Sequence, residues 1–366
     1  MPGVTATVRE LFRRLELQRI RYAVMRNYEH LPNIHDERLK RTTDIDLVIH
    51  SEDLPRWRQL VKRLAEDHEW DALAECDHWT QSGVRDHHIE AFRFYRCSPP
   101  EFLQVDVFHA YIAMGLPLMD EAEMLDGRIH DEARGLTHID PRKETLYRLL
   151  QVHGLRASGS SPEKVDRYID KIMAVYHSHD RGFRRLVGRY FGVFGKAALG
   201  ALPANDYARF STCMRWAKLY FAARFALGHP VQAARCVIAR ARENRERFVT
   251  RQCGFVVKIC AASEEQRAVV RSVLDGLAQW NFVEEWSERA SAGTGITPRE
   301  HGVMEQGGLV VEWVEAREAQ IHIGQTQVGR SGNASVELVR RALIERLIER
   351  HPVLYRECGS RVAQVS

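Results

Sequence analysis

The segment Thr43-Asp-Ile-Asp-Leu-Val-Ile49 joins an apolar run to two acidic residues at its start. Asp44 and Asp46 lie two residues apart, so on a β-strand their side chains project from the same face. Two carboxylates held this close repel each other unless a positive charge lies between them. Hard divalent cations such as Mg²⁺ or Mn²⁺ prefer oxygen ligands of this kind. The segment therefore predicts a strand that carries part of a metal site.

A third acid interrupts another apolar run, Leu103-Gln-Val-Asp-Val-Phe108. An Asp inside such a run is costly to bury, so Asp106 needs a partner or a metal. If this strand lies beside the first, the catalytic and metal-binding candidates Asp44, Asp46 and Asp106 converge. Such a group suits phosphoryl or nucleotidyl transfer, in which two cations ~3.5–4 Å apart hold the attacking and leaving oxygens. The alternative is that the Asp-x-Asp pair ends a strand or caps a turn.

Local patterns around these acids predict an alternation of helices and strands. Thr7 and Glu10 form a capping box for a helix over residues 7–20. The other expected elements are a strand over residues 21–27, a loop over 28–43, a helix after Ser51, and two strands, 88–96 and 102–111, that pair as a hairpin.

This order resembles the nucleotidyltransferase superfamily, which includes DNA polymerase β and the aminoglycoside nucleotidyltransferases. The segment Tyr22-Ala-Val-Met-Arg-Asn-Tyr-Glu-His-Leu-Pro32, with the two acidic strands, is similar to a bacterial branch that carries an R-N-Y-E-x-L-P run. The resemblance covers residues 7–180. It implies an α+β domain, with a small mixed sheet flanked by helices.

The resemblance also implies an activity, which is Mg²⁺-dependent transfer of a nucleoside monophosphate from a nucleoside triphosphate to a hydroxyl acceptor. By it, Asp44 and Asp46 bind the cations that hold the triphosphate, and Asp106 completes the site and orients or deprotonates the acceptor hydroxyl. The acceptor could be a sugar, a lipid-linked molecule or another small molecule.

The superfamily usually has Gly-Ser after the first strand, where this sequence has Met25-Arg-Asn27. Arg26 can substitute as a bidentate phosphate clamp and Asn27 as a hydrogen-bond donor. The alternative is that the triphosphate is bound differently or not at all. Lys143, in the helix after the catalytic strands, reaches the phosphates if that helix closes over the site, although a solvated helix face explains it equally well.

The length of 366 residues favours several domains. We expect the catalytic domain over residues 1–140, a helical region over 141–250 and an α/β domain over 251–366. Some members of the branch carry a thymidylate-kinase-like domain, so a degenerate P-loop kinase-like fold is one interpretation of the last part. Its expected phosphate loop, Ala261 to Arg267, has no Gly and no Lys, which favours a scaffold or interaction module.

Basic charge is concentrated in the middle of the chain. Residues 181–250 contain 14 Lys and Arg against three acids, while the whole chain has a net charge of +4. This segment could contact an anionic membrane face or nucleic acid. Solvated outer faces of helices are the simpler interpretation.

The seven cysteines are scattered and include no C-x-x-C pair, and the N-terminus has no apolar leader. These features predict reduced thiols and a cytoplasmic protein. The most apolar stretches, residues 191–202 and 219–226, are interrupted by Lys196 and Arg224 and fall short of the ~20 residues that cross a bilayer, so we expect no transmembrane segment. The preferred function is the metal-dependent nucleotidyltransferase. The alternatives are a catalytically inactive protein that uses the same fold for binding or as a scaffold, and a basic-surface binder of membranes or nucleic acid.

Overall fold

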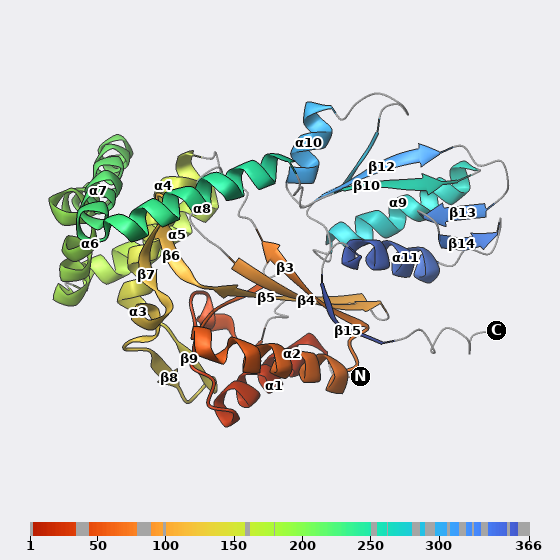
Figure 1. The fold of residues 1–366 in the computed structure, drawn as a ribbon, viewed down its shortest axis with the longest axis horizontal. Coiled ribbons are helices and arrows are strands. Elements are labelled where there is room, and N and C mark those ends of the chain that lie inside the picture. Colours follow the sequence, from red (N-terminus) through yellow and green to blue (C-terminus); the bar gives the residue numbers. More distant parts are fainter. Residues whose placement is uncertain are drawn as a thin grey trace.

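The Asp-x-Asp strand lies inside a mixed sheet of eight strands in the order β15-β3-β4-β5-β2-β1-β9-β8. Strands β3, β4, β5 and β15 of this sheet are labelled in Figure 1. The strands are β1 (Tyr22–Val24), β2 (Asp44–Ile49), β3 (Ala72–His78), β4 (Ile89–Cys97), β5 (Pro100–Phe108), β8 (Ile129–Asp131), β9 (Leu136–His138) and β15 (Val353–Arg356). The computed structural model describes residues 3–33, 44–78, 89–97, 100–157, 162–178, 180–249, 255–261, 263–279, 286–289, 297–305, 308–314, 320–323, 326–330, 336–349 and 352–357.

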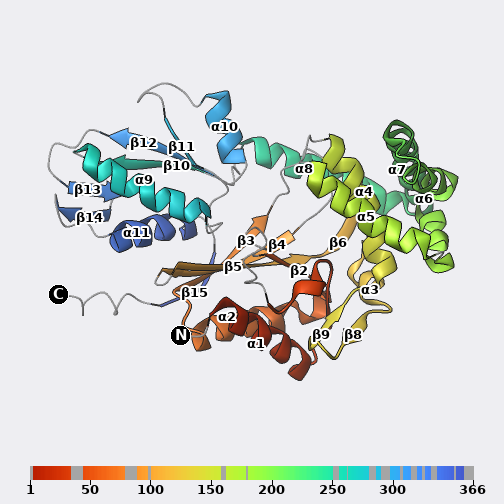
Figure 2. The same cartoon turned by 180° about the vertical axis from the view of Figure 1, so that it is seen from behind.

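Helices α1 (Val4–Leu17) and α2 (Leu54–Asp67) cover one face of this sheet (Figure 2). Their apolar residues recur at helical spacing and pack on the inward residues of β1, β2, β4 and β5. Helix α1 starts three residues earlier than expected, after Gly3. The capping box is therefore wrong, because Thr7 lies inside the helix, where its hydroxyl accepts a hydrogen bond from Trp70 Nε1 at 3.2 Å.

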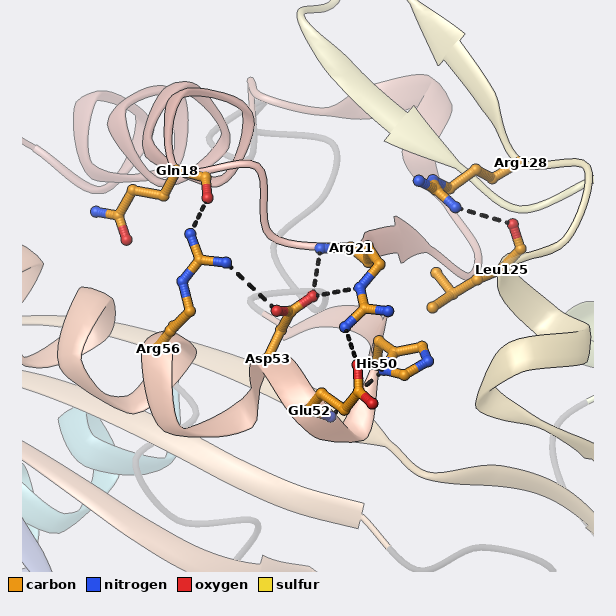
Figure 3. Close-up of polar contacts among 8 residues, drawn as sticks. All are labelled: Gln18, Arg21, His50, Glu52, Asp53, Arg56, Leu125 and Arg128. Carbon is orange, nitrogen blue, oxygen red and sulfur yellow. Dashed lines mark hydrogen bonds and ion pairs between the residues drawn. The ribbon is translucent and has the colours of Figure 1, made fainter.

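Strand β1 is shorter than the sequence suggested and ends at Val24. The backbone N–H of Met25 still donates to the carbonyl of Asp46 at 2.9 Å, and Asn27 then adopts the left-handed conformation, with φ of 57°. At its other end, the backbone N–H and Nε of Arg21 donate to Asp53 at 3.0 and 2.8 Å, which ties β1 to the start of α2 (Figure 3). Arg56 donates to the same carboxylate, at 3.4 Å, and to the carbonyl of Gln18 (Figure 3).

The expected hairpin of β4 and β5 is confirmed as an antiparallel pair in continuous register from Ile89↔Phe108 to Cys97↔Pro100. Strand β5 ends at Phe108 rather than at Tyr111. The chain then turns into a second hairpin, formed by β6 (Ala110–Ala113) and β7 (Leu116–Asp120), which lies outside the eight-stranded sheet.

The region predicted to be helical, residues 141–250, contains α4 (Pro141–Ala157), α5 (Pro162–His177), α6 (Arg181–Ala201), α7 (Tyr207–Gly228) and α8 (Pro230–Val249). The short helix α3 (Glu121–Leu125) precedes it, before β8 and β9. In both views α6 and α7 stand at one end of the molecule, and α8 runs from them toward the C-terminal sheet (Figures 1 and 2). Within the described residues, we find no helix with the length and apolar character needed to cross a membrane.

The C-terminal region forms a second sheet in the order β11-β12-β10-β13-β14. Its elements are β10 (Phe255–Cys260), α9 (Glu264–Gln279), β11 (Trp286–Glu288), α10 (Pro298–Glu305), β12 (Leu309–Val314), β13 (Gln320–Ile323), β14 (Thr326–Arg330) and α11 (Val336–Ile348). Strands β10, β11 and β12 are parallel, whereas β13 and β14 form an antiparallel hairpin. After α11 the chain returns to the first sheet, where β15 pairs with β3.

Candidate metal centre

The three acids of the predicted site lie together on one face of the central sheet. Strands β2 and β5 are parallel neighbours, and their register pairs Asp46 with Asp106 and Asp44 with Gln104. One carboxylate oxygen from each of Asp44, Asp46 and Asp106 lies within 4.8 Å of the other two. Asp44 is exposed, whereas Asp46 and Asp106 are only 2% and 3% exposed. This arrangement places three potential oxygen ligands around one point.

The site occupies a polar strip between two packed regions of the same sheet face. On β5, Phe102 packs in the cluster formed with the C-terminal sheet, and Phe108 packs in the cluster formed with the helical middle. Side chains alternate along a strand, so Gln104 and Asp106 lie on this face between the two phenylalanines. The site is therefore bounded by the C-terminal sheet with α11 on one side and by the helical middle on the other.

Arg26 contacts one of the three acids, Asp46, directly through both carboxylate oxygens. Its Nη2 donates to Asp46 Oδ1 at 2.8 Å, and its Nε donates to Asp46 Oδ2. Burial disfavours the charged guanidinium, but the attraction of Asp46 outweighs it and holds the pKa of Arg26 well above its usual value. The guanidinium thus occupies both oxygens of Asp46, in the bidentate geometry that arginine forms with carboxylates.

The pKa of Asp106 is raised well above its ordinary value, first by burial and then by the negative charges of Asp46 and Asp44. Two neighbours oppose this shift. Gln104 Nε2 donates to Asp106 Oδ1 at 2.9 Å, and the charge of Arg93 favours the carboxylate. Arg93 Nε in turn donates to Gln104 Oε1 at 2.9 Å, which fixes the orientation of the amide.

Gln104 and Arg93 were not among the residues predicted for the site. Gln104 carries a readable signal, because it lies two residues before Asp106 and so shares its face. Arg93 lies on β4, where the register places it opposite Gln104. That pairing between strands is not encoded in any local spacing.

The remaining candidates for phosphate binding lie differently. The structure does not bring Lys143 to the acids through any described contact, because its Nζ donates to the carbonyls of Glu123 and Asp126, both at 2.5 Å. These bonds anchor α4 on α3. Lys143 can therefore reach a phosphate only if both bonds break. Asn27 follows Arg26 and shapes the turn through its backbone, immediately before the short helix η1 (Tyr28–His30).

A second polar group, which was not predicted from the sequence, lies buried beside Arg26. Glu144 and Arg148 on α4 form an ion pair, and the guanidinium lies 4.9 Å from the centre of the Tyr168 ring. Burial, and then the charge of Glu144, raises the pKa of Tyr111 well above its usual value, and the charges of Arg26 and Asp46 also act on it. These residues form the wall of the helical middle next to the acids.

The residues present fit a divalent cation. All three potential ligands supply carboxylate oxygen, which suits Mg²⁺ or Mn²⁺, and two of them are almost fully buried. Within the described residues, Asp44, Asp46 and Asp106 are the three acidic, His or Cys side chains whose ligand atoms lie close enough together to share an ion. A cation there would neutralise the repulsion that raises the pKa of Asp106, and it would compete with Arg26 for Asp46.

No protein-family profile matches the sequence, and no curated protein matches it. One solved structure is similar, that of an antigenic nucleotidyltransferase-like protein from Paracoccidioides brasiliensis. The two chains share 16% identity with a TM-score of 0.31, over 55% of this chain and 93% of that one.

Proposed function

We propose that this protein is a metal-dependent nucleotidyltransferase. The observation that carries the proposal is the register of β2 and β5, which pairs Asp46 with Asp106 and gathers three carboxylates on one face of a mixed sheet. In this interpretation Asp44, Asp46 and Asp106 hold Mg²⁺ or Mn²⁺. When bound, the cation supplies charge neutralisation to a nucleoside triphosphate.

The reaction that this geometry supports is an in-line displacement at the α-phosphorus. The acceptor oxygen forms a bond to that phosphorus, the bond from phosphorus to the oxygen bridging to the β-phosphate breaks, and pyrophosphate leaves. The acceptor hydroxyl proton passes to Asp106 or to solvent. Asp106 lies in register beside Asp46 among the potential metal ligands, which places its carboxylate where it can accept this proton.

Arg26 has two roles in this proposal. Without a cation it balances the charge of Asp46. With a cation on the carboxylates, its guanidinium is released and can bind phosphate oxygens as a bidentate donor. Asn27 and Lys143 remain weaker candidates for phosphate contact, and Lys143 first has to leave its two carbonyl partners. The acceptor is a hydroxyl compound.

One observation favours a second candidate, a catalytically inactive binding protein. The Arg26–Asp46 ion pair takes up both oxygens of Asp46, which a metal ligand needs. If this pair persists in the presence of metal, the fold serves as a scaffold. The C-terminal sheet is proposed as an interaction module in either case, and a degenerate kinase-like origin for it stays a hypothesis.

Titration with Mn²⁺ and a nucleoside triphosphate separates the two candidates. The catalyst predicts triphosphate binding that requires the cation and is lost in Asp46→Asn and Asp106→Asn, with pyrophosphate release once a hydroxyl acceptor is found. Leu17→Ser, at an exposed position in α1, is the matched control and retains both. Cation-independent binding, or no effect of either substitution, excludes the catalyst.

A further inference from the structure

Large apolar side chains are concentrated on the solvent side of α6, α7 and α8. Of the fifteen large hydrophobic residues that are exposed in the described chain, eight lie in these helices, so their exposure is not evenly scattered. They are Val193, Trp216, Leu219, Tyr220, Leu227, Val231, Val237 and Ile238. We call them the apolar face.

Helix α7 is apolar on both of its sides. Its inner side buries Phe210, Met214 and Phe221 in the core of the helical middle. Its outer side presents Trp216, 54% exposed, and Leu227, 85% exposed. Exposed apolar patches of this kind mark interaction sites, so the outer side of α7 is suited to contact a partner.

The aromatic part of the apolar face is ordered by contacts between helices. The ring of Phe194 on α6 lies 6.1 Å from that of Trp216 and 6.5 Å from that of Tyr220. Gly192 adopts a φ of 59°, and a Cβ there would lie 2.9 Å from the Tyr220 ring. The chain therefore gives up regular helix at this glycine and lets the tyrosine ring pack close beside α6.

The segment that carries the apolar face is strongly basic. Residues 181–250 contain fourteen Lys and Arg and three acids, Asp206, Glu243 and Glu246. Asp206 is the N-cap of α7, where it accepts a hydrogen bond from the backbone of Arg209 at 3.0 Å, and Glu123 of α3 pairs with Arg189 at 3.1 Å. Arg215 and Arg224 are exposed on α7 itself. The partner of this surface is therefore anionic as well as apolar.

These properties together favour a lipid surface over two other partners. A second copy of the chain would bring two strongly positive segments together, which is unfavourable. A nucleic acid satisfies the arginines but offers nothing to Leu219, Leu227 or Val231. An anionic membrane supplies phosphates for arginine, a headgroup layer for Trp and Tyr, and acyl chains for the aliphatic residues.

We propose that the apolar face of α6, α7 and α8 docks on an anionic lipid surface, with the helices lying along it. Such binding combines buried apolar area with electrostatic attraction and needs no spanning helix. The proposal is independent of the nucleotidyltransferase activity, because none of its residues belongs to the acidic site.

Vesicle flotation of the full chain tests it. We expect the protein to float with vesicles of phosphatidylcholine containing phosphatidylglycerol, to float poorly with phosphatidylcholine alone, and to be released by salt. Trp216→Ser and Leu227→Ser, singly, should each lower the partition coefficient about tenfold, since each removes a large apolar contact. Leu17→Ser and Ile129→Ser, at exposed positions outside the face, should leave it unchanged.

Three results overturn the proposal. The first is the absence of flotation at low salt. The second is equal loss in the control variants, or retention in Trp216→Ser and Leu227→Ser when circular dichroism shows all four folded. The third is binding to duplex nucleic acid, or dimerisation in light scattering, that depends on these residues while vesicles bind weakly.

Discussion

Asp46 and Asp106 occupy paired positions on the parallel strands β2 and β5, and both side chains are almost fully buried. Two like charges in this position oppose each other. Arg26 is bonded to Asp46, and the positive charge of Arg93 acts on Asp106. The pair therefore differs internally, because Asp46 has a cationic partner and Asp106 is bonded to an amide. We therefore expect substitutions of the two acids to change the stability of the metal-free protein by different amounts.

Asp46→Asn should destabilise the metal-free protein, whereas Asp106→Asn should not. The first leaves Arg26 without its buried anion, at a cost of about 3 kcal/mol. The second removes a carboxylate whose pKa is already raised by burial and by its acidic neighbours. Urea unfolding in EDTA measures both. Equal destabilisation by the two changes would show that the ion pair does not set the balance.

Arg26→Gln should strengthen cation binding in the absence of nucleotide, because it frees both oxygens of Asp46. The affinity for Mn²⁺ should rise about tenfold, because one charge-assisted contact that competes with the metal for Asp46 is removed. Affinity for the triphosphate should fall in the same variant if the guanidinium binds phosphate. Mn²⁺ titration followed by calorimetry measures both, and Arg13→Gln, whose partner is Glu10, is the control. Weaker Mn²⁺ binding in Arg26→Gln contradicts the competition.

Gln104→Leu should weaken cation binding about tenfold while leaving the fold intact. The amide orients Asp106 through a 2.9 Å bond, and partners of this kind commonly contribute this much to metal affinity. The thermal midpoint in EDTA should stay close to that of the unchanged protein, since Gln104 is only partly buried. If Gln104→Leu binds Mn²⁺ with unaltered affinity, the strand alone is enough to orient Asp106.

His153 should make the stability of the fold fall at acidic pH. Burial, and then the positive charges of Lys218 and Arg215, lowers the pKa of His153 from 6.5 to about 4. The unfolded chain therefore binds a proton that the folded chain refuses between pH 6.5 and pH 4, so stability falls as the pH drops through this window. Urea unfolding at pH 7.5 and 5 should show a smaller loss for His153→Gln. Equal losses in the two proteins would exclude this residue as the source.

Asp53→Ala should destabilise the protein by about 2 kcal/mol, because it leaves the backbone N–H and Nε of Arg21 without an acceptor (Figure 3). Glu52→Ala is the matched control, since this neighbour also pairs with Arg21 but its side chain is 74% exposed. Exposed pairs contribute under about 1 kcal/mol. Urea unfolding compares the two, and similar losses would mean that burial of Asp53 is irrelevant.

The sequence alone was enough to predict much of the secondary structure and the common face of Asp44 and Asp46. Strand and helix periodicities are local, so an apolar pattern fixes which side of an element is buried. The β4–β5 hairpin was predictable for the same reason. The absence of a capping box at Thr7 could not be predicted in this way, because the burial of that hydroxyl depends on Trp70, sixty-three residues away.

Only the tertiary structure decided which strands and charges meet. The register that places Asp106 beside Asp46, the bond of Arg26 to Asp46, the carbonyl partners of Lys143 and the return of β15 to β3 all join distant parts of the chain. Side-chain spacing specifies the face of a strand but leaves its neighbour open. The neighbour follows from packing the whole set of helices and strands, through contacts that no single stretch of sequence contains.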